Sequence, residues 1–577
     1  MNAPAPRALV TARYGLLALV CGAALIYFTW RCGVVDPRHP AFGWLVLAAE
    51  GVGFARTLLF LLSAVRLSHR AQPAAPAGLR VDVFVTTVDE SPEIVQRTLA
   101  AACALRYPHE TWLLDDGDRP AMRSLAGEFG CRYLARRERA GAKAGNLNSA
   151  LAVAGGDFVA VFDADHVPAP HFLDRTLGYF SDDRVAFVQT PHEFSNGDSF
   201  DHLAPERTAS HGQAAFHHVV QHSRDGANAT VFAGSAAVFR RGALDAVGGF
   251  ATGTLTEDVH TSLRLHAAGW HSVFHPEVVS AGLAALDAAG FYAQRLRWAQ
   301  GAVQLVLREN LAGQPGLTTR QRQSYLFHVV SNLEGWRYLV IYALPIAMLL
   351  TGIVPLRTGA ATFTFFFVPY TLAVFLATTE FARGHGRVFE STVYNLTRIP
   401  ISIRATLGGH RERAFAVTPK TRAVRGRPLE DALPWLVVIT TGAAAAYAVA
   451  AAYGGRSSLS GAALAVVLVW AAYHTIVAAR LIALTRRCAR PAVAPRVLTI
   501  EAFAAADRGD CGGYLGALFP ALVRSVDADI PDRVEVALRK GPERHHGFGA
   551  HDAAARGDLL GHELTELVVF ADAGDRH

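Results

Sequence analysis

The sequence predicts an α/β domain with a mostly parallel sheet, inserted in an α-helical membrane domain of about six spans and followed by a small C-terminal β domain. The first observation behind this fold class is a mean hydropathy of +0.21 with 51% hydrophobic residues, which is high for a protein without membrane segments. The second is the arrangement, because apolar runs flank a central segment in which strand-like and helix-like stretches alternate.

Six apolar runs are long enough to cross the hydrocarbon core of a bilayer. They are residues 14–30, 41–65, 338–356, 362–379, 433–453 and 462–482. Arginine and lysine concentrate after the second, fourth and last runs, while the opposite connections are short and carry little charge. Because basic loops stay on the cytoplasmic side, we expect a multi-pass protein of the plasma or inner membrane whose central domain and both termini are cytoplasmic.

Two charged residues, Glu50 and Arg56, stand inside the second apolar run. An unpaired charge is costly within a membrane. We therefore expect these residues either to pair with each other or to face a polar channel. A shorter span that leaves one of them at the membrane surface is a third interpretation.

The net charge of +6 and the pI near 9.0 suit basic loops beside a membrane and a substrate that carries phosphate. Binding to nucleic acid would need a basic face with interleaved aromatic residues, which the sequence does not show, so no nucleic-acid partner is expected. The six cysteines lack the spacing of metal ligands and indicate free thiols in a reducing compartment.

The central segment alternates short apolar strands with helices. The expected strands are residues 81–87, 111–114, 131–134 and 157–162, and the expected helices are residues 92–105, 120–129 and 143–153. Such alternation predicts a parallel sheet, and ligands bind beyond the carboxyl ends of the strands in these sheets. Asp115 and Asp116 follow one strand, and Asp163 and Asp165 follow another. These carboxylates are therefore expected at one edge of the sheet.

Three short motifs in this domain suit a sugar nucleotide. Two carboxylates one residue apart, as in Asp163-Ala164-Asp165, can share a divalent cation that neutralises a departing diphosphate. Lys143 stands at a helix start, where backbone N–H groups already favour a phosphate. Asp115 and Asp116 offer acceptors to a uracil or a ribose. Each motif alone also has an ordinary interpretation, respectively a turn with capping aspartates, a solvated lysine and an Asp-Asp-Gly turn.

Two further motifs suit the reaction and the acceptor. Asp258, in Thr256-Glu257-Asp258, precedes a helix expected at residues 259–268 and can act as the general base for a sugar hydroxyl. The other interpretation of Asp258 is an acid that stabilises a helix N-terminus. Gln294, Arg297 and Trp298 fall on one face of a helix at i, i+3 and i+4. The guanidinium fits a diphosphate, and the indole offers a flat face to a sugar ring.

The ordered set of motifs resembles the catalytic subunits of bacterial cellulose synthase and, more broadly, processive members of glycosyltransferase family 2. The set is Asp-Asp-Gly, Lys-Ala-Gly-Asn, Asp-x-Asp, Gln-Thr-Pro-His, Phe-x-Gly-Ser, Thr-Glu-Asp and Gln-x-x-Arg-Trp, spread over residues 81–310. The resemblance implies a GT-A-like glycosyltransferase fold for the α/β domain and a single inverting displacement on a nucleotide sugar. Residues 415–420 (FAVTPK) resemble the gating loop that closes over the donor.

The resemblance implies a role for each matching residue. The nucleotide and its diphosphate would be bound by Thr87, Glu90, Asp115, Asp116, Lys143, Asp163, Gln294, Arg297 and Thr418. The acceptor would be bound by Trp298, His192, Phe232, Gly234 and Ser235. Asp163 and Asp165 would hold Mg2+ or Mn2+, and Asp258 would be the catalytic base.

The C-terminal segment resembles a PilZ domain more weakly. Arg486, Arg487 and Arg490 fit its Arg-x-x-x-Arg start and would bind cyclic di-GMP as an activator, but its Asp-x-Ser-x-x-Gly motif is reduced to Asp510-Cys511-Gly512-Gly513. Basic residues after a span are also what membrane topology predicts. Strand-like runs at residues 497–500, 514–519, 534–538 and 566–570 predict the small β domain.

Four parts are expected along the chain. Residues 1–70 would hold two spans, and residues 80–312 the glycosyltransferase domain. Residues 320–485 would hold four spans, the gating loop and interfacial helices at residues 325–336 and 388–405. Residues 486–577 would hold the degenerate PilZ-like domain.

The favoured function is transfer of glucose from UDP-glucose to the non-reducing end of a β-1,4-glucan, with export of the polymer and accessory subunits as partners. Departures from the family pattern leave the product open, since residues 86–90 read TTVDE instead of PTYNE. Alternatives are a synthase of mixed-linkage glucan, mannan or amino-sugar polymer, and a lipid-linked monosaccharide transferase. A non-catalytic scaffold that responds to cyclic di-GMP is a further alternative, but the motif set is intact.

Overall fold

The computed structural model describes residues 7–65, 67–68, 70–196, 199–200, 212–311, 313–385, 388–408, 428–488, 534–535 and 570–571. Two compact units, Met1–Phe503 and Ala504–His577, divide the chain. In the second unit, β11 (Val534–Glu535) pairs antiparallel with β12 (Phe570–Ala571). The remainder of the predicted β domain lies outside the described residues, as do Thr418, Arg490 and the side chain of Arg487.

The first unit contains a seven-stranded sheet built from the apolar runs of the central segment. Its strands are β1 (Val81–Thr87), β2 (Glu110–Asp115), β3 (Arg132–Ala135), β4 (Phe158–Asp163), β6 (Val185–Gln189), β8 (Ala237–Arg240) and β9 (His271–Phe274). They lie in the order β3-β2-β1-β4-β8-β6-β9. Every neighbouring pair is parallel except those of β8, which runs antiparallel to β4 and β6. The predicted mostly parallel sheet is confirmed.

Helices cover both faces of this sheet. They are α3 (Pro92–Cys103), α4 (Pro120–Glu128), α5 (Ala142–Leu151), α6 (Phe172–Thr176), α8 (Arg241–Ala246) and α9 (Glu257–Ala267). Val83 and Phe84 are neighbours in β1 and point to opposite faces. Val83 packs in a cluster with Leu99 and Leu125, whereas Phe84 packs in another with Leu147. A strand that is covered on both faces reads as a continuous apolar run, which is why β1 was predicted with its observed bounds.

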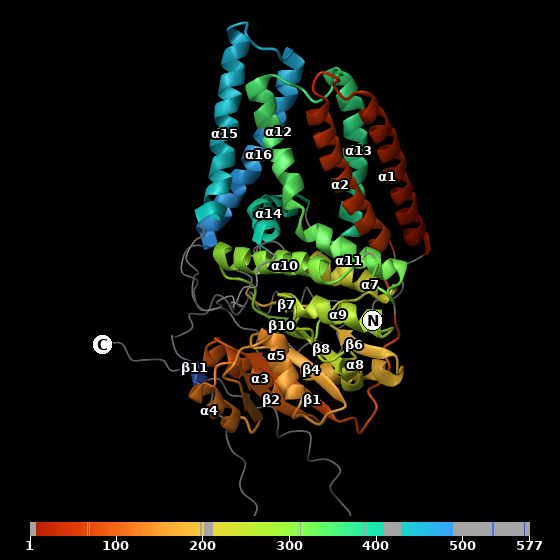
Figure 1. The fold of residues 1–577 in the computed structure, drawn as a ribbon, viewed down its shortest axis with the longest axis vertical. Coiled ribbons are helices and arrows are strands. Elements are labelled where there is room, and N and C mark those ends of the chain that lie inside the picture. Colours follow the sequence, from red (N-terminus) through yellow and green to blue (C-terminus); the bar gives the residue numbers. More distant parts are fainter. Residues whose placement is uncertain are drawn as a thin grey trace, which may run out of the picture. The chain divides into compact units, whose positions relative to one another are not determined.

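Smaller elements complete the α/β domain. A three-stranded sheet has the order β5 (Val167–Pro168), β10 (Ser280–Gly282) and β7 (Glu193–Phe194). The turn η1 (Leu177–Ser181) precedes β6, and the π-helical turn η2 (Phe216–Gln221) leads into α7 (His222–Asp225). Figure 1 shows β7 and β10 between the large sheet and the helices that lie beneath the spans.

Five described helices are long and apolar enough to cross a membrane: α1 (Arg7–Gly33), α2 (Pro40–Ala64), α13 (Ala360–Phe381), α15 (Pro428–Tyr453) and α16 (Gly461–Cys488). A sixth span results if α11 (Thr319–Asn332) and α12 (Gly335–Thr351), which meet at 44°, count as one bent span. This agrees with the prediction of about six spans. The interfacial helix predicted at residues 325–336 is wrong in its bounds, because the chain breaks between α11 and α12 inside it.

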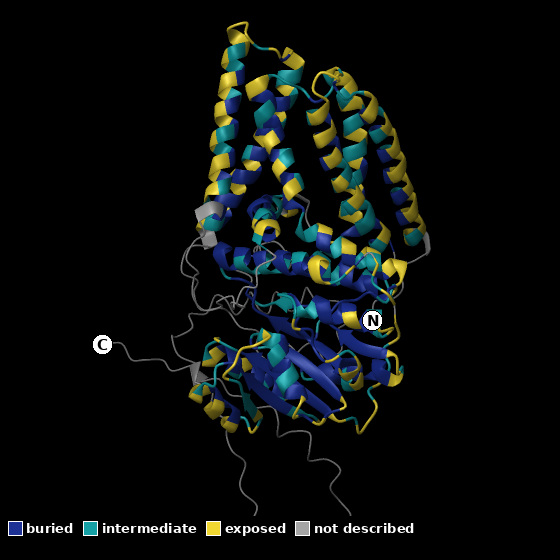
Figure 2. Cartoon of the chain, in the orientation of Figure 1, coloured by how far each residue is buried: buried dark blue, intermediate teal, exposed yellow. Residues whose placement is uncertain are grey.

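In Figure 1 the spans appear as two groups, α1 with α2 and α13, and α12 with α15 and α16, and α2 and α12 contact each other across the two groups. Stacked rings join α1 to α13, with Tyr27 and Tyr370 at 4.6 Å and Trp30 and Phe366 at 4.6 Å between centroids. The faces of the spans that point away from other helices are exposed (Figure 2), as expected of surface that contacts lipid. Between the spans and the α/β domain lie α10 (Ala288–Arg308), α11 and α14 (Val388–Gly408).

The two charges of α2 have separate partners. Glu50 lies 3.2 Å from Nε of the buried Arg31 and accepts a 3.2 Å hydrogen bond from the Tyr27 hydroxyl. Arg56 lies 3.0 Å from the carboxylate of Glu334, which stands between α11 and α12. Pairing of Glu50 with Arg56 is therefore the wrong interpretation of that apolar run.

Candidate active site

Strand register brings the predicted polar residues to one edge of the large sheet. In the pairing of β1 with β2, Thr87 is opposite Asp115, and in the pairing of β1 with β4, Thr86 is opposite Asp163. These strands are parallel, so all three carboxyl ends meet there. Residues separated by almost eighty positions in the sequence thus share one site.

A cavity of about 1240 Å³ lies between this edge and helices α2, α10, α11 and α14. Most of the site residues predicted from the sequence line it: Thr87, Glu90, Asp116, Lys143, Asp163, Asp165, His192, Phe232, Gly234, Asp258, Gln294, Arg297 and Trp298. Asp115 and Ser235 are buried behind its wall. Arg486 does not line it either, and its guanidinium lies 4.9 Å from the ring centroid of Trp435.

Asp115 and Arg119 fix the turn after β2. The fully buried Asp115 carboxylate accepts hydrogen bonds from Arg119 Nε at 3.0 Å, from the Arg119 backbone N–H at 2.7 Å and from the Tyr133 hydroxyl at 2.9 Å. Arg119 in turn donates to Thr87 Oγ1 at 2.7 Å. Thr87 donates to Glu90 at 2.8 Å. Asp115 therefore positions this wall of the cavity from behind.

Asp116 is held by a second arginine that the sequence patterns did not single out. Arg136 forms a two-pronged ion pair with it, through Nε at 2.7 Å and Nη2 at 2.9 Å. Arg139, which lines the cavity, donates from Nε to the Asp116 carbonyl at 2.9 Å. No local pattern marks these arginines, because they lie about twenty residues from Asp116 and pair with it only through the fold.

The acidic residues after β4 form a cluster with a histidine. One ligand atom each from Asp163, Asp165 and His166 lie within 4.8 Å of one another. Among the described residues, neither ring nitrogen of the buried His166 has a hydrogen-bond partner. Carboxylate oxygens suit Mg2+ or Mn2+, and a neutral imidazole is a common metal ligand, so the donor set fits a divalent cation. His166 was missed although it directly follows the Asp-x-Asp pattern.

Lys143 connects the acidic cluster to the next strand. Its ammonium group donates to the carboxylate of Asp163 and to the carbonyl of Gly234. Burial opposes the charged form, but Asp163 and Glu257 outweigh it and raise the pKa of Lys143. The lysine therefore keeps its charge beside the cavity, where it can meet a phosphate.

Asp258 lies in the first turn of α9 with one oxygen facing the cavity. Its Oδ1 accepts a 2.8 Å hydrogen bond from the Val259 backbone. Burial raises the pKa of the Asp258 carboxyl to about 7, and the adjacent Glu257 adds to this rise. A carboxylate with a pKa near neutrality can accept a proton under physiological conditions. The sequence indicated the residue but not this pKa.

Close packing fixes the Asp258 turn against α10. A β-carbon on Gly301 of α10 would lie 2.4 Å from Thr256 Oγ1, so only glycine allows this approach. Gln304, also on α10, accepts a 2.8 Å hydrogen bond from the Leu255 backbone. The two motifs that carry the predicted base and the predicted acceptor platform are thus held together.

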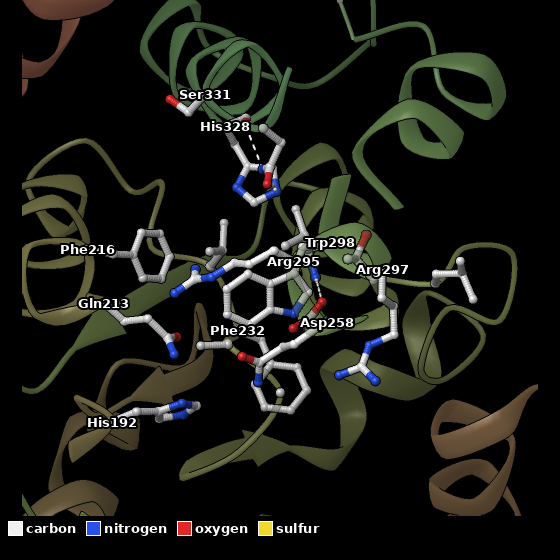
Figure 3. Close-up of a pocket in the computed structure, with 18 of the residues that line it drawn as sticks. His192, Gln213, Phe216, Phe232, Asp258, Arg295, Arg297, Trp298, His328 and Ser331 are labelled. Carbon is white, nitrogen blue, oxygen red and sulfur yellow. Dashed lines mark hydrogen bonds between the residues drawn. The ribbon is translucent and has the colours of Figure 1, made fainter. Parts of the chain in front are cut away.

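The α10 face contributes Gln294, Arg297 and Trp298 to the cavity, as its spacing predicted. Burial lowers the pKa of the Arg297 guanidinium. Figure 3 shows the Trp298 ring with Arg295 on one side and Asp258 on the other, and Arg297 beyond Asp258. The Arg295 guanidinium lies 4.4 Å from the ring centroid of Trp298, a cation–π contact that fixes the indole. Arg295 was not predicted as a site residue.

Buried aromatic and polar groups form the wall beside Asp163. His192 Nε2 lies 2.8 Å from the Ser235 carbonyl, and Ser235 Oγ accepts a 3.0 Å hydrogen bond from the Asp163 backbone. Burial lowers the pKa of His192 to about 3, so its ring is neutral and donates to that carbonyl. The His217 ring stacks on His192 at 4.6 Å between centroids. Ser235 therefore supports Asp163 and His192 from behind the cavity wall.

Comparison with known proteins finds similar sequences among glycosyltransferases. Residues 158–378 match the family model for "Glycosyl transferase family group 2". Cellulose synthase 1 of Komagataeibacter xylinus is 33% identical over 393 residues, which are 66% of this chain and 25% of that protein. A cellulose synthase catalytic subunit (UDP-forming) of Komagataeibacter sucrofermentans is 32% identical over 412 residues, which are 69% of this chain and 53% of that protein. The resemblance drawn from the motifs is confirmed.

Two other similar proteins cover smaller shares of the chain. A cellulose synthase catalytic subunit (UDP-forming) of Xanthomonas axonopodis pv. citri is 37% identical over 317 residues, which are 52% of this chain and 43% of that protein. The mannosyltransferase PcManGT of Pyrobaculum calidifontis, solved with GDP-Man and Mn2+, has a TM-score of 0.46 and 21% identity over 64% of this chain and 98% of that chain. The chain spans between a quarter and about half of the length of the curated relatives it matches.

Proposed function

Because residues 158–378 carry a glycosyl transferase family group 2 domain, we propose that this membrane protein is a processive inverting glycosyltransferase. It transfers glucose from UDP-glucose to the non-reducing end of a β-1,4-glucan and passes the polymer through its spans. The observation that carries the proposal is one cavity beneath the spans that joins Asp258 and Trp298 to Lys143 and Asp163. The relatives named as UDP-forming cellulose synthase subunits support the choice of donor and product.

The donor lies at the carboxyl edge of the sheet. Glu90, Thr87 and Asp116 face the nucleoside, since these polar groups line the cavity beside the turn that Asp115 fixes. Lys143 and Arg297 meet the diphosphate as it gains negative charge in the transition state. Asp163, Asp165 and His166 would hold a divalent cation, Mg2+ or Mn2+, which would neutralise the charge of the leaving diphosphate.

The acceptor lies above the Trp298 ring, with its terminal hydroxyl turned toward Asp258. Asp258 takes the proton of that hydroxyl, and the oxygen attacks the anomeric carbon of the donor from the face opposite the diphosphate. The bond between the anomeric carbon and the diphosphate breaks, so an α-linked donor gives a β-linked product and UDP. Arg295 keeps the indole in place through its cation–π contact.

The membrane part passes the polymer outward. Under this proposal the α/β domain and both termini are cytoplasmic, because the basic segments after the second, fourth and last spans face that side. The division into residues 1–70, 80–312, 320–485 and 486–577 is part of the proposal. The proposal also includes three further points. Thr418 contacts the donor from the gating loop, cyclic di-GMP binds at Arg486, Arg487 and Arg490, and accessory subunits take part in export.

A test uses the purified protein in lipid with Mg2+ or Mn2+ and labelled donors. UDP-glucose, UDP-GlcNAc and GDP-mannose are offered separately, with and without cyclic di-GMP, and nucleotide release and polymer are followed. The proposal expects polymer from UDP-glucose that a β-1,4-specific glucanase degrades. Polymer that resists this enzyme would contradict the linkage, and polymer from another donor alone would contradict the sugar. Absence of turnover with every donor would contradict the enzymatic assignment.

A further inference from the structure

Three arginines from three different helices line the side of the cavity that faces the spans. They are Arg56 of α2, Arg337 of α12 and Arg398 of α14, and we call them the arginine wall. None of them belongs to a motif predicted to bind the donor or to act in the reaction. Their side chains are 31%, 15% and 34% exposed, and all three residues line the cavity.

One fully buried carboxylate stands behind the arginine wall. Glu334, with a side-chain exposure of 0%, occupies the break between α11 and α12. Its oxygens lie 3.0 Å from Arg56 Nε, 3.1 Å from Arg337 Nη2 and 3.9 Å from Arg398 Nη1. One negative charge therefore faces three positive charges, and the wall as a whole remains positive. A guanidinium has five N–H donors, so contact with one carboxylate leaves donors for another group.

Glycines allow this convergence. A β-carbon on Gly53 of α2 would lie 2.9 Å from Arg337 Nη1, so the arginine crosses α2 where no side chain stands. A β-carbon on Gly335 would lie 2.0 Å from the Arg398 carbonyl, so α12 and α14 touch at backbone distance. The Gly335 N–H donates to Ser402 Oγ at 3.0 Å. The three helices therefore pack closely around Glu334.

We propose that Glu334 is a positioning residue for the polymer that leaves the catalytic cavity. Its carboxylate holds the arginine wall in place, and the outward N–H groups of the wall donate to the hydroxyl and ring oxygens of the sugars beyond the acceptor terminus. This inference rests on the proposed function, because it requires a polymer in the cavity. Sugar oxygens are acceptors that suit this donor-rich surface, whereas the nucleotide is bound at the sheet edge.

The replacement Glu334→Gln tests the proposal. It keeps the shape of the side chain but leaves three neighbouring guanidinium groups without a counter-charge, so they repel one another and lose their common orientation. We expect a polymer that is about tenfold shorter, because it dissociates earlier, while the KM for UDP-glucose changes by less than about twofold. A change in product length at constant donor KM separates positioning of the polymer from general damage.

Glu430→Gln provides the matched control. Glu430 is also buried in the membrane part, with 1% side-chain exposure, and its carboxylate binds Arg404 of α14. Neither Glu430 nor Arg404 lines the cavity. This replacement removes a comparable ion pair between helices, and we expect the product length of the unaltered protein.

Two outcomes would overturn the inference. One is a Glu334→Gln protein whose polymer is as long as that of the unaltered protein, and the other is an equal shift in donor KM and product length in both glutamate variants. If Glu334→Gln does not accumulate as folded protein, Arg398→Gln replaces it in the test, because Glu334 then still has Arg56 and Arg337 as partners. The Arg398→Gln protein is expected to make a shorter polymer. Absence of polymer from the unaltered protein would overturn the proposed function itself, and this inference with it.

Discussion

A β-carbon on Gly234 would stand 3.4 Å from Oδ2 of Asp258. Gly234 has a φ of +95°, a conformation that other residues rarely adopt. The carboxylate proposed as the base therefore faces bare backbone, and the carbonyl of the same glycine accepts a hydrogen bond from Lys143. One residue thus borders both the base and the lysine proposed to bind the diphosphate.

Replacement Gly234→Ala is expected to lower turnover by about tenfold or more, because the methyl group occupies space that the acceptor hydroxyl needs beside Asp258. The positive φ also costs stability, so a control must separate the two effects. Gly248→Ala is matched, since Gly248 has a φ of +82° and a β-carbon there would have no other atom within 4 Å. Nucleotide release by both purified variants checks the prediction, and equal turnover in the two would contradict it.

The pH dependence of turnover should report Asp258. Only the ionised carboxylate accepts a proton, and its pKa is raised to about 7. The rate is therefore expected to rise through pH 7 and to fall about tenfold for each pH unit below it. A profile of kcat/KM against pH checks this. The measurement should span the expected pKa, from roughly pH 5.5 to 8. A kcat/KM that stays constant over this range, while the protein remains folded, would contradict the assignment of Asp258 as the base.

The same raised pKa predicts a stability effect of defined sign. A carboxyl whose pKa is higher in the folded than in the unfolded state binds its proton more tightly when folded. Its contribution to folding is fully present below the unfolded pKa of about 3.9, falls as the pH rises above that value and is lost by pH 7. Asp258→Asn should therefore raise the melting temperature at pH 8, by an amount that shrinks as the pH is lowered toward about 4. A variant that is less stable than the original protein at pH 8 would contradict the raised pKa.

Asp115 is expected to stabilise the folded protein. Its buried carboxylate accepts four hydrogen bonds, from Gly117, Tyr133 and twice from Arg119. Asp115→Asn should cost about 2–3 kcal/mol of unfolding free energy, because at least one donor then lacks its acceptor. Denaturant unfolding in detergent measures this. Asp157→Asn is the control, since that aspartate forms an exposed ion pair with Arg80 and should change stability little; equal effects of the two would contradict the prediction.

Divalent cation binding is expected to depend on the acidic cluster. Asp165→Asn or His166→Ala should weaken Mn2+ binding by about tenfold or more, as measured by calorimetry with the metal alone. Chelation of the metal should likewise weaken UDP binding. Asp183→Asn, which alters a fully exposed aspartate outside the cluster, is the control. Unchanged Mn2+ affinity in both cluster variants would contradict the assigned ligands.

Local sequence patterns predicted much of the fold and many of the residues that line the cavity. Buried parallel strands are continuous apolar runs, so β1 and its neighbours were predicted to within two residues of their bounds. The i, i+3, i+4 spacing placed Gln294, Arg297 and Trp298 on the cavity face of α10. The break between α11 and α12 was missed, because residues 332–336 (NLEGW) contain no proline and Glu334 finds its partners only in the fold.

Residues that act through distant partners could not be predicted. Asp115 and Asp116 look alike in the sequence, but strand register turns the first toward Arg119 and leaves the second beside the cavity. Arg136 directly follows β3, and Arg398 lies on α14, so their partners are set by the sheet order and by helix packing. The pKa of Asp258 depends on burial beneath α10, which no spacing of residues encodes.

The most direct test of the central claim compares Asp258→Asn with the original protein in lipid, with labelled UDP-glucose as donor. We expect the variant to bind UDP with the original affinity and its rate of UDP release with a glucan acceptor to fall by about a hundredfold or more, because a general base is lost. Release of UDP and growth of polymer at the original rate would contradict the assignment of Asp258 as the base.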